Sequence, residues 1–313
     1  MTELIPFAAC ILIAFGIGSN DTSNSLGICI GAGIITLRRA VLLFGCFVFI
    51  GIILQGQKVM KTVGKDLVEV NPSMLSIVLW ISAFLIILSN WKKIPLSTTQ
   101  VIIGGLTGAG AASGVDINSV SLLKIASSWI ISPLTAFFFS FVIYQLMEKT
   151  LSRFALFYIE RILRYLLLLS GILMSYNTGA NELATVFGPV IYSGLINKMP
   201  SYLLGAFFVF LGAVLLSSRV IETVGKGITA LDPYSGFAAQ LGAGSCVLLF
   251  TSLGMPISTT YCIIGGISGV GMVKGMKTVR INLIKKMIVN WILAPSLAFF
   301  ICFILTKAIR YWS

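Results

Sequence analysis

The sequence predicts an all-α integral membrane protein built from two inverted-topology repeats with broken helices and re-entrant helical hairpins. Composition, internal repetition and paired polar motifs carry this prediction. Of 313 residues, 57% are hydrophobic and only 10% are charged, and the mean hydropathy is +1.00. A soluble domain carries about 25% charged residues. Apolar stretches of about 17–25 residues, the length that a bilayer core requires, recur along the chain. We therefore expect a multi-pass protein of the cell membrane, in contact with lipid.

The charged residues exclude several classes of function. The net charge is +12, but Lys and Arg lie in short groups between apolar segments, where membrane topology places them. No nucleic-acid partner is therefore predicted. The chain contains no His, which rules out His-based catalytic triads, His metal sites and His proton relays. The six Cys residues stand in apolar stretches and are expected to be small buried hydrophobic residues.

The chain repeats itself at a spacing of 161 positions. The sequence TVGK at 62–65 recurs at 223–226, FVF at 47–49 recurs at 208–210, and STT at 97–99 recurs at 258–260. One inserted residue then aligns Pro133 with Pro295. This agreement predicts a tandem duplication, with an N-terminal repeat at 1–147, a charged cytoplasmic linker at 148–164 and a C-terminal repeat at 165–313.

The distribution of positive charge predicts that the repeats are inverted. If the linker is cytoplasmic, the inside loops collect about twice as many Lys and Arg residues as the outside loops. This bias favours an odd number of crossings in each repeat, and therefore both termini outside. Lys92 and Lys274 are then predicted inside, and Lys58 and Lys198 outside.

The first polar motif is GIGSNDTSNSLG at 16–27, matched by YNTGANELATVFG at 176–188. Residues 4–36 would extend about 50 Å as one helix, too long for a single crossing, so a break is expected between Gly16 and Asp21. Asp21 and Glu182 stand in lipid-compatible segments, where an ionisable residue indicates function. Snorkelling to the interface is the alternative. Carboxylate and amide oxygens are the ligands that hard cations such as Na⁺ prefer.

The second polar motif is IPLSTTQVIIGG at 94–105, repeated as MPISTTYCIIGG at 255–266. The prolines suit a helix start, and the Ser and Thr residues would then lie at the positive N-terminus, which is an anion site. The alternative is that these hydroxyls bond back to their own helices. Neither motif contains Lys or Arg, while Asp21 and Glu182 add negative charge. A buried anion would therefore need accompanying cations, which indicates cation-coupled anion symport.

These paired motifs resemble those of the inorganic phosphate transporter (PiT) family. GSNDTSNSLG and GANELATVFG are similar to its paired GANDxxN signatures, and PLSTT and PISTT to its second pair. The resemblance implies Na⁺-coupled or H⁺-coupled symport of inorganic phosphate by a homodimer, with no cofactor besides the coupling ion. By motif position it implies that cations are bound by Asn20, Asp21, Asn24, Asn181 and Glu182. It implies that phosphate is bound by Ser97, Thr98, Thr99, Ser258, Thr259 and Thr260, together with Asp21 and Glu182.

Some residues depart from the family pattern and leave alternatives open. The chain has Glu182 where the family usually has Asp, Thr185 where it has Asn, and Gln100 and Tyr261 where it often has His. These departures leave the coupling ion and its stoichiometry open. A sulfate symporter of the same fold is the main alternative, and an anion channel is a weaker one. An intramembrane hydrolase acting through Ser97 or Ser258 would lack His and a neighbouring Lys, so no enzyme activity is predicted.

Overall fold

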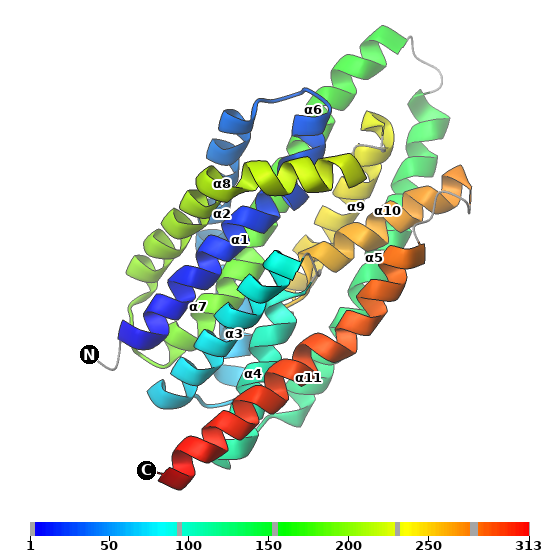
Figure 1. Ribbon diagram of the computed structural model, residues 1–313. Helices are drawn as coiled ribbons and strands as arrows, with labels where there is room; N and C mark the ends of the chain where they lie inside the picture. Colours follow the sequence, from blue (N-terminus) through cyan, green and yellow to red (C-terminus); the bar gives the residue numbers. More distant parts are fainter. Residues whose placement is uncertain (1–3, 93–95, 152–155, 229–231, 276–280, 313) are drawn as a thin grey trace.

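The computed structural model describes residues 4–92, 96–151, 156–228, 232–275 and 281–312, and within these ranges every regular element is a helix (Figure 1). The first repeat contains α1 (Leu4–Gly31), α2 (Leu37–Lys61), the π-helical turn η1 (Thr62–Asp66), α3 (Pro72–Lys92), α4 (Thr98–Ser113) and α5 (Ser119–Leu151). The second contains α6 (Leu156–Asn177), the π-helical turn η2 (Thr178–Leu183), α7 (Ala184–Tyr192), α8 (Lys198–Ile228), α9 (Pro233–Ser252), α10 (Thr259–Lys274) and α11 (Ile281–Trp312). Six helical segments of the described chain are long and apolar enough to cross a membrane, which agrees with the predicted multi-pass protein.

Helix boundaries recur between the two halves at the spacing found in the sequence. The first residues of α2, α3 and α4 lie 161 positions before those of α8, α9 and α10, and α5 begins 162 positions before α11. The inserted residue therefore lies between α10 and α11, in the second half of the chain. The predicted linker at 148–164 overlaps the end of α5 and the start of α6, and its residues 152–155 lie outside the described residues. The division into two repeats and a cytoplasmic linker stays a prediction.

The helices α3 and α4 form one helical hairpin, and α9 and α10 form another. Figure 1 shows that the two hairpins enter the bundle from opposite ends and point their tips toward its centre. The tips touch, since the Thr99 hydroxyl donates to the carbonyl oxygen of Ile257 over 3.3 Å. This arrangement agrees with the predicted re-entrant hairpins.

Glycines let each hairpin pack closely against the last helix of the other repeat. A Cβ atom added to Gly104 of α4 would lie 2.2 Å from the carbonyl oxygen of Pro295 in α11, and one added to Gly108 would lie 2.2 Å from that of Phe299. The contacting residue numbers increase together along the two helices, so α4 runs parallel to α11. The same pairing joins α10 to α5, through Gly265 with Pro133 and Gly269 with Phe137.

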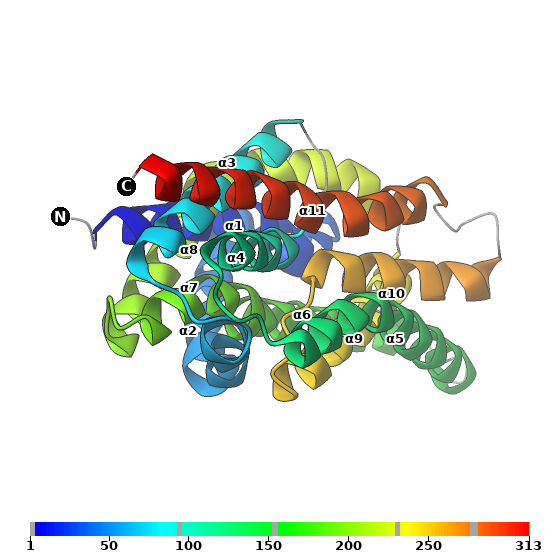
Figure 2. The ribbon, with the colours of Figure 1, turned by 90° about the horizontal axis from the view of Figure 1, so that it is seen from below.

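These contacts fix the relative direction of two corresponding helices. The helices α4 and α5 run in opposite directions (Figure 1), and α4 is parallel to α11. The corresponding helices α5 and α11 are therefore antiparallel, as inverted repeats require. Seen from below, α11 and α5 lie on opposite sides of the bundle (Figure 2).

The predicted break in the first helix is wrong. The helix α1 is continuous through Gly16 and Asp21, and its 28 residues extend about 42 Å, which a tilted helix can accommodate. The Thr22 hydroxyl bonds back to the carbonyl oxygen of Gly18 over 2.7 Å. Gly18 serves close packing, because a Cβ atom there would lie 1.9 Å from the carbonyl oxygen of Val209 in α8. At the matching motif of the second repeat, the chain forms the π-helical turn η2 in place of regular α-helix.

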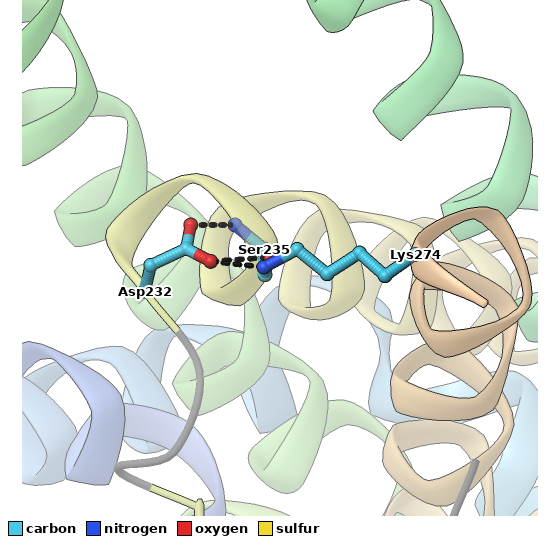
Figure 3. Close-up of polar contacts among 3 residues, drawn as sticks. All are labelled: Asp232, Ser235 and Lys274. Atoms are coloured by element: carbon cyan, nitrogen blue, oxygen red, sulfur yellow. Dashed lines mark hydrogen bonds and ion pairs between the residues drawn. The ribbon is translucent and has the colours of Figure 1, made fainter. Parts of the chain in front are cut away.

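An ion pair joins the two ends of the second hairpin at its base. Asp232 caps α9 by accepting a hydrogen bond from the Ser235 backbone N–H over 2.9 Å, and Lys274, the last residue of α10, donates to the same carboxylate (Figure 3). Partial burial raises the pKa of the Asp232 carboxyl, but hydrogen bonds from Lys274 and Ser235 outweigh it, so the net pKa is lowered. The matching positions in the first hairpin are the uncharged Asn71 and Ser113.

Candidate anion and cation site

The two hairpin tips, α1 and η2 enclose a small cavity of about 20 Å³. Both repeats contribute residues to it, including one buried carboxyl group from each. Of the residues singled out from the sequence, the cavity is lined by Asn20, Asp21, Ser97, Thr98, Glu182, Ser258 and Thr260. Residues far apart in the chain therefore meet at one place, as the paired motifs predicted.

The two carboxyl groups lie side by side in the cavity wall. Asp21 and Glu182 are each only 5% exposed, and their carboxyl groups lie within hydrogen-bonding reach of each other. The Asn24 amide donates to Asp21 over 2.9 Å and to the Thr260 hydroxyl over 3.2 Å, and the Thr259 hydroxyl donates to Glu182. Two adjacent buried negative charges are costly without compensation, so this pair requires a cation or a proton. Carboxylate, amide and hydroxyl oxygens are hard donors and fit Na⁺.

The tips present two helix N-termini to the cavity. Ser97 and Ser258 are the N-cap residues of α4 and α10, and each side-chain oxygen accepts from a backbone N–H three residues later over 3.4 Å. The helix start predicted at the proline is wrong for Pro256, which lies two residues before the N-cap and accepts a hydrogen bond from Trp129 at its carbonyl oxygen. Pro95 lies outside the described residues. Two positive helix ends thus face the same space, which suits an anion.

Four predicted residues do not line the cavity. Asn24 and Thr259 instead donate hydrogen bonds to the two carboxyl groups that do line it, and Thr99 joins the two tips. The fully buried Asn181 instead holds the second tip: its amide donates to the Thr251 hydroxyl over 2.9 Å and to the Met255 carbonyl over 3.0 Å. The equivalent Asn20 does line the cavity. The assignment of Asn181 as a direct cation ligand stays a prediction.

Sequence reasoning did not identify the apolar part of the wall. Ile17 of α1, Ile86 of α3 and Leu96 of the first tip also line the cavity. Such residues carry no chemical signature in a sequence that is apolar almost throughout. The side chains that follow the STT sequences are also unusual, since the Gln100 amide and the Tyr261 hydroxyl are buried and have no hydrogen-bond partner in the described structure. The sequence signalled these two only as departures from the family pattern.

Helices that end inside a membrane bundle, with polar groups gathered between two repeats, are typical of secondary transporters. The fold and the site are therefore those of a membrane transport protein. The profile of the phosphate transporter family matches residues 17–302, so the chain belongs to the phosphate transporter family.

Individual relatives cover nearly the whole chain. A protein of Methanocaldococcus jannaschii named as a phosphate permease is 37% identical over 95% of this chain and 94% of its own length. The sulfate permease CysP of Bacillus subtilis is 29% identical over 97% of this chain and 87% of its own. A solved structure entitled "The sodium-dependent phosphate transporter" superimposes with a TM-score of 0.87 at 26% identity, covering 99% of both chains. The family resemblance seen in the motifs is therefore confirmed.

Proposed function

We propose that this protein is a secondary active transporter that carries inorganic phosphate across the cell membrane by symport with Na⁺. One observation carries the proposal: two equivalent hairpin tips and two equivalent carboxyl residues, one of each from either repeat, line the same cavity. The family membership and the names of the relatives support phosphate as the substrate. H⁺ is the alternative coupling ion.

The carboxyl groups favour phosphate over sulfate. Hydroxyl groups of the tips and the two helix N-termini donate hydrogen bonds to either anion. Phosphate also carries a proton near neutral pH and can donate a hydrogen bond to Asp21 or Glu182, which sulfate cannot do. Both acids lie in the cavity wall with Ser97 and Ser258. Similarity to a sulfate permease makes sulfate the competitor to test.

Charge in the cavity accounts for the coupling. Two ionised carboxylates and HPO₄²⁻ sum to about −4, and each helix N-terminus offsets about half a charge. About two or three Na⁺ ions should therefore accompany each phosphate, unless one acid is transported protonated. A cavity of about 20 Å³ has room for about one water molecule, so the tips must separate to admit the anion.

Membrane orientation and oligomeric state belong to the same proposal. The start of α1 and the end of α11 lie at the same end of the molecule (Figures 1 and 2). This is expected if both termini lie on one side of the membrane. The charge distribution places that side outside. The homodimer rests on the family resemblance alone.

The decisive experiment is uptake of labelled phosphate by purified protein in liposomes. A Na⁺ gradient alone should drive accumulation, and excess sulfate should compete poorly. Asp21→Asn should abolish accumulation, while Asp116→Asn, a carboxyl change at an exposed position outside the cavity, should not. Accumulation driven by a proton gradient in Na⁺-free buffer, and unaffected by added Na⁺, would identify H⁺ instead. Uptake indifferent to every cation gradient would indicate a channel.

A further inference from the structure

A second and larger cavity, of about 730 Å³, lies between α2, α6, α7 and α9. Its polar lining consists of two amides, two ammonium groups, phenol groups and one hydroxyl, and no Asp or Glu is among the residues that line it. The residues that matter here are Gln55, Gln57, Lys58, Lys61, Tyr176 and Ser252. Lys61 pairs with Asp66 over 3.4 Å, whereas the Lys58 ammonium group donates to a neutral backbone carbonyl oxygen, that of Ser252. The cavity therefore favours anions.

This cavity adjoins the second hairpin tip. Ser252 is the last residue of α9, and its hydroxyl accepts a hydrogen bond from the Gln55 amide over 2.7 Å, while the Lys58 ammonium donates to its carbonyl oxygen over 2.8 Å. The preceding residue, Thr251, contacts Asn181, which is followed by Glu182 of the central cavity. Contacts from Ser252 through Thr251 and Asn181 thus connect the larger cavity with the candidate site.

The duplication shows that this polar lining is not a consequence of the fold. At the spacing of 161 residues, Gln55 corresponds to Leu216 and Ser252 to Trp91. Tyr176 likewise corresponds to Phe15. The matching residues of the other repeat are therefore apolar at these three positions, although α2 and α8 begin at matching residues, as do α3 and α9. Lys58 corresponds to Arg219, so the repeats differ in the uncharged polar residues.

We propose that the cavity is an anion vestibule, in which Lys58 and Lys61 attract phosphate and concentrate it beside the second hairpin tip. The identity of the anion rests on the proposed function, but the attraction of anions does not. A concave surface of one charge sign focuses the electrostatic field and raises association rates about 10-fold to 1,000-fold. A lipid headgroup offers the same phosphate chemistry, so the test must separate the two sources.

Charge-selective labelling tests the vestibule without requiring transport. The probe is Gln57→Cys with the exposed Cys46 replaced by Ala, since the other five cysteines are buried. The rates of reaction with an anionic and a cationic thiosulfonate are compared. Their ratio cancels any change in the thiolate fraction, because both reagents attack the same thiol. The ratio should favour the anionic reagent severalfold, and Lys58→Gln with Lys61→Gln should remove this preference.

Two controls sharpen the labelling result. Lys65→Gln removes an exposed lysine on the same segment that lines a different cavity, and it should change the ratio much less. The preference should also fade between about 10 mM and 1 M salt, as the Debye length falls from about 30 Å to about 3 Å. A ratio that is insensitive to both lysine substitutions would overturn the vestibule.

Inorganic phosphate and lipid are then separated by vesicle composition. In vesicles of phosphatidylcholine alone, inorganic phosphate at low salt should slow anionic labelling of the Gln57→Cys variant. Slowing that appears only when anionic lipid is added, and not with phosphate, would assign the site to a headgroup and overturn a phosphate vestibule. In transport, Lys58→Gln with Lys61→Gln should raise the KM for phosphate severalfold and leave the maximal rate unchanged. If the wild type takes up no phosphate but the labelling ratio still depends on both lysines, the proposed function fails while the vestibule stands.

Discussion

At the scale of single residues, the hydroxyl groups of the two STT sequences lie in different places, some in the cavity wall and one at the contact between the tips. Ser97 and Ser258 cap their helices and line the cavity. Thr99 instead ties the tips together through the Ile257 carbonyl. The back-bonding expected as an alternative from the sequence occurs in α1, at Thr22, and not at these serines. Hydroxyl groups of the same motif therefore serve different purposes.

This division predicts separate effects of neighbouring substitutions. A hydrogen bond to a charged group contributes about 1.5–3 kcal/mol, so Ser97→Ala and Ser258→Ala should each weaken phosphate binding about tenfold to a hundredfold. Thr99→Val should lower the thermal stability and leave affinity nearly unchanged. Binding can be measured by calorimetry in detergent with saturating Na⁺.

Ser97→Thr serves as the control, because it keeps the capping oxygen. A strong loss of affinity from Ser258→Ala and none from Ser97→Ala would contradict a site shared by the two tips. A loss of affinity from Thr99→Val equal to that from the serine changes would contradict the assignment of Thr99 to structure.

At the scale of helices, glycine residues determine how closely the helices of the two repeats can pack. The contacts of α4 on α11 and of α10 on α5 are made against backbone carbonyls. A backbone carbonyl in a packed helix cannot rotate away as a flexible side chain can. The positions of the hairpins, and therefore of their tips, depend on these contacts.

Gly265→Ala should accordingly be strongly destabilising. The new methyl group would lie 2.2 Å from the Pro133 carbonyl oxygen, and overpacking of this kind costs about 1–3 kcal/mol or more. Gly27→Ala is the matched control, since its nearest neighbour would lie at an ordinary 3.8 Å. Thermal unfolding followed by size-exclusion chromatography in detergent compares the two. Equal unfolding temperatures for both variants would show that α10 is free to shift away from α5.

At the scale of the whole molecule, the hairpins enter from opposite ends and meet in the middle (Figure 1). Such an arrangement lets one central site be reached from either side of a membrane when the tips move. The vestibule, which adjoins only the second hairpin, makes the two approaches chemically different. On the predicted topology it opens outside, because Lys58 lies there.

The topology can be tested by cysteine labelling in intact cells. Lys198 and Lys274 are both exposed and both in described helices, and the charge distribution places them on opposite sides. In a cysteine-free background, Lys198→Cys should react with an impermeant thiol reagent applied outside, and Lys274→Cys only after the cells are opened. Reaction of both from the outside would contradict the inverted arrangement in the membrane.

The sequence by itself determined what is written in repeated form: the duplication, the two hairpins, and the paired acids and hydroxyls that meet between them. A repeated local signal is readable because each copy confirms the other. Tertiary structure alone decided that α1 stays continuous at Gly18, that Asn20 lines the cavity whereas Asn181 holds the second tip, and that a polar cavity forms beside the second tip. The physical reason is that glycine permits both a helix break and close packing. At Gly18 the neighbouring Val209 of α8, which no local pattern reveals, determines which of the two occurs.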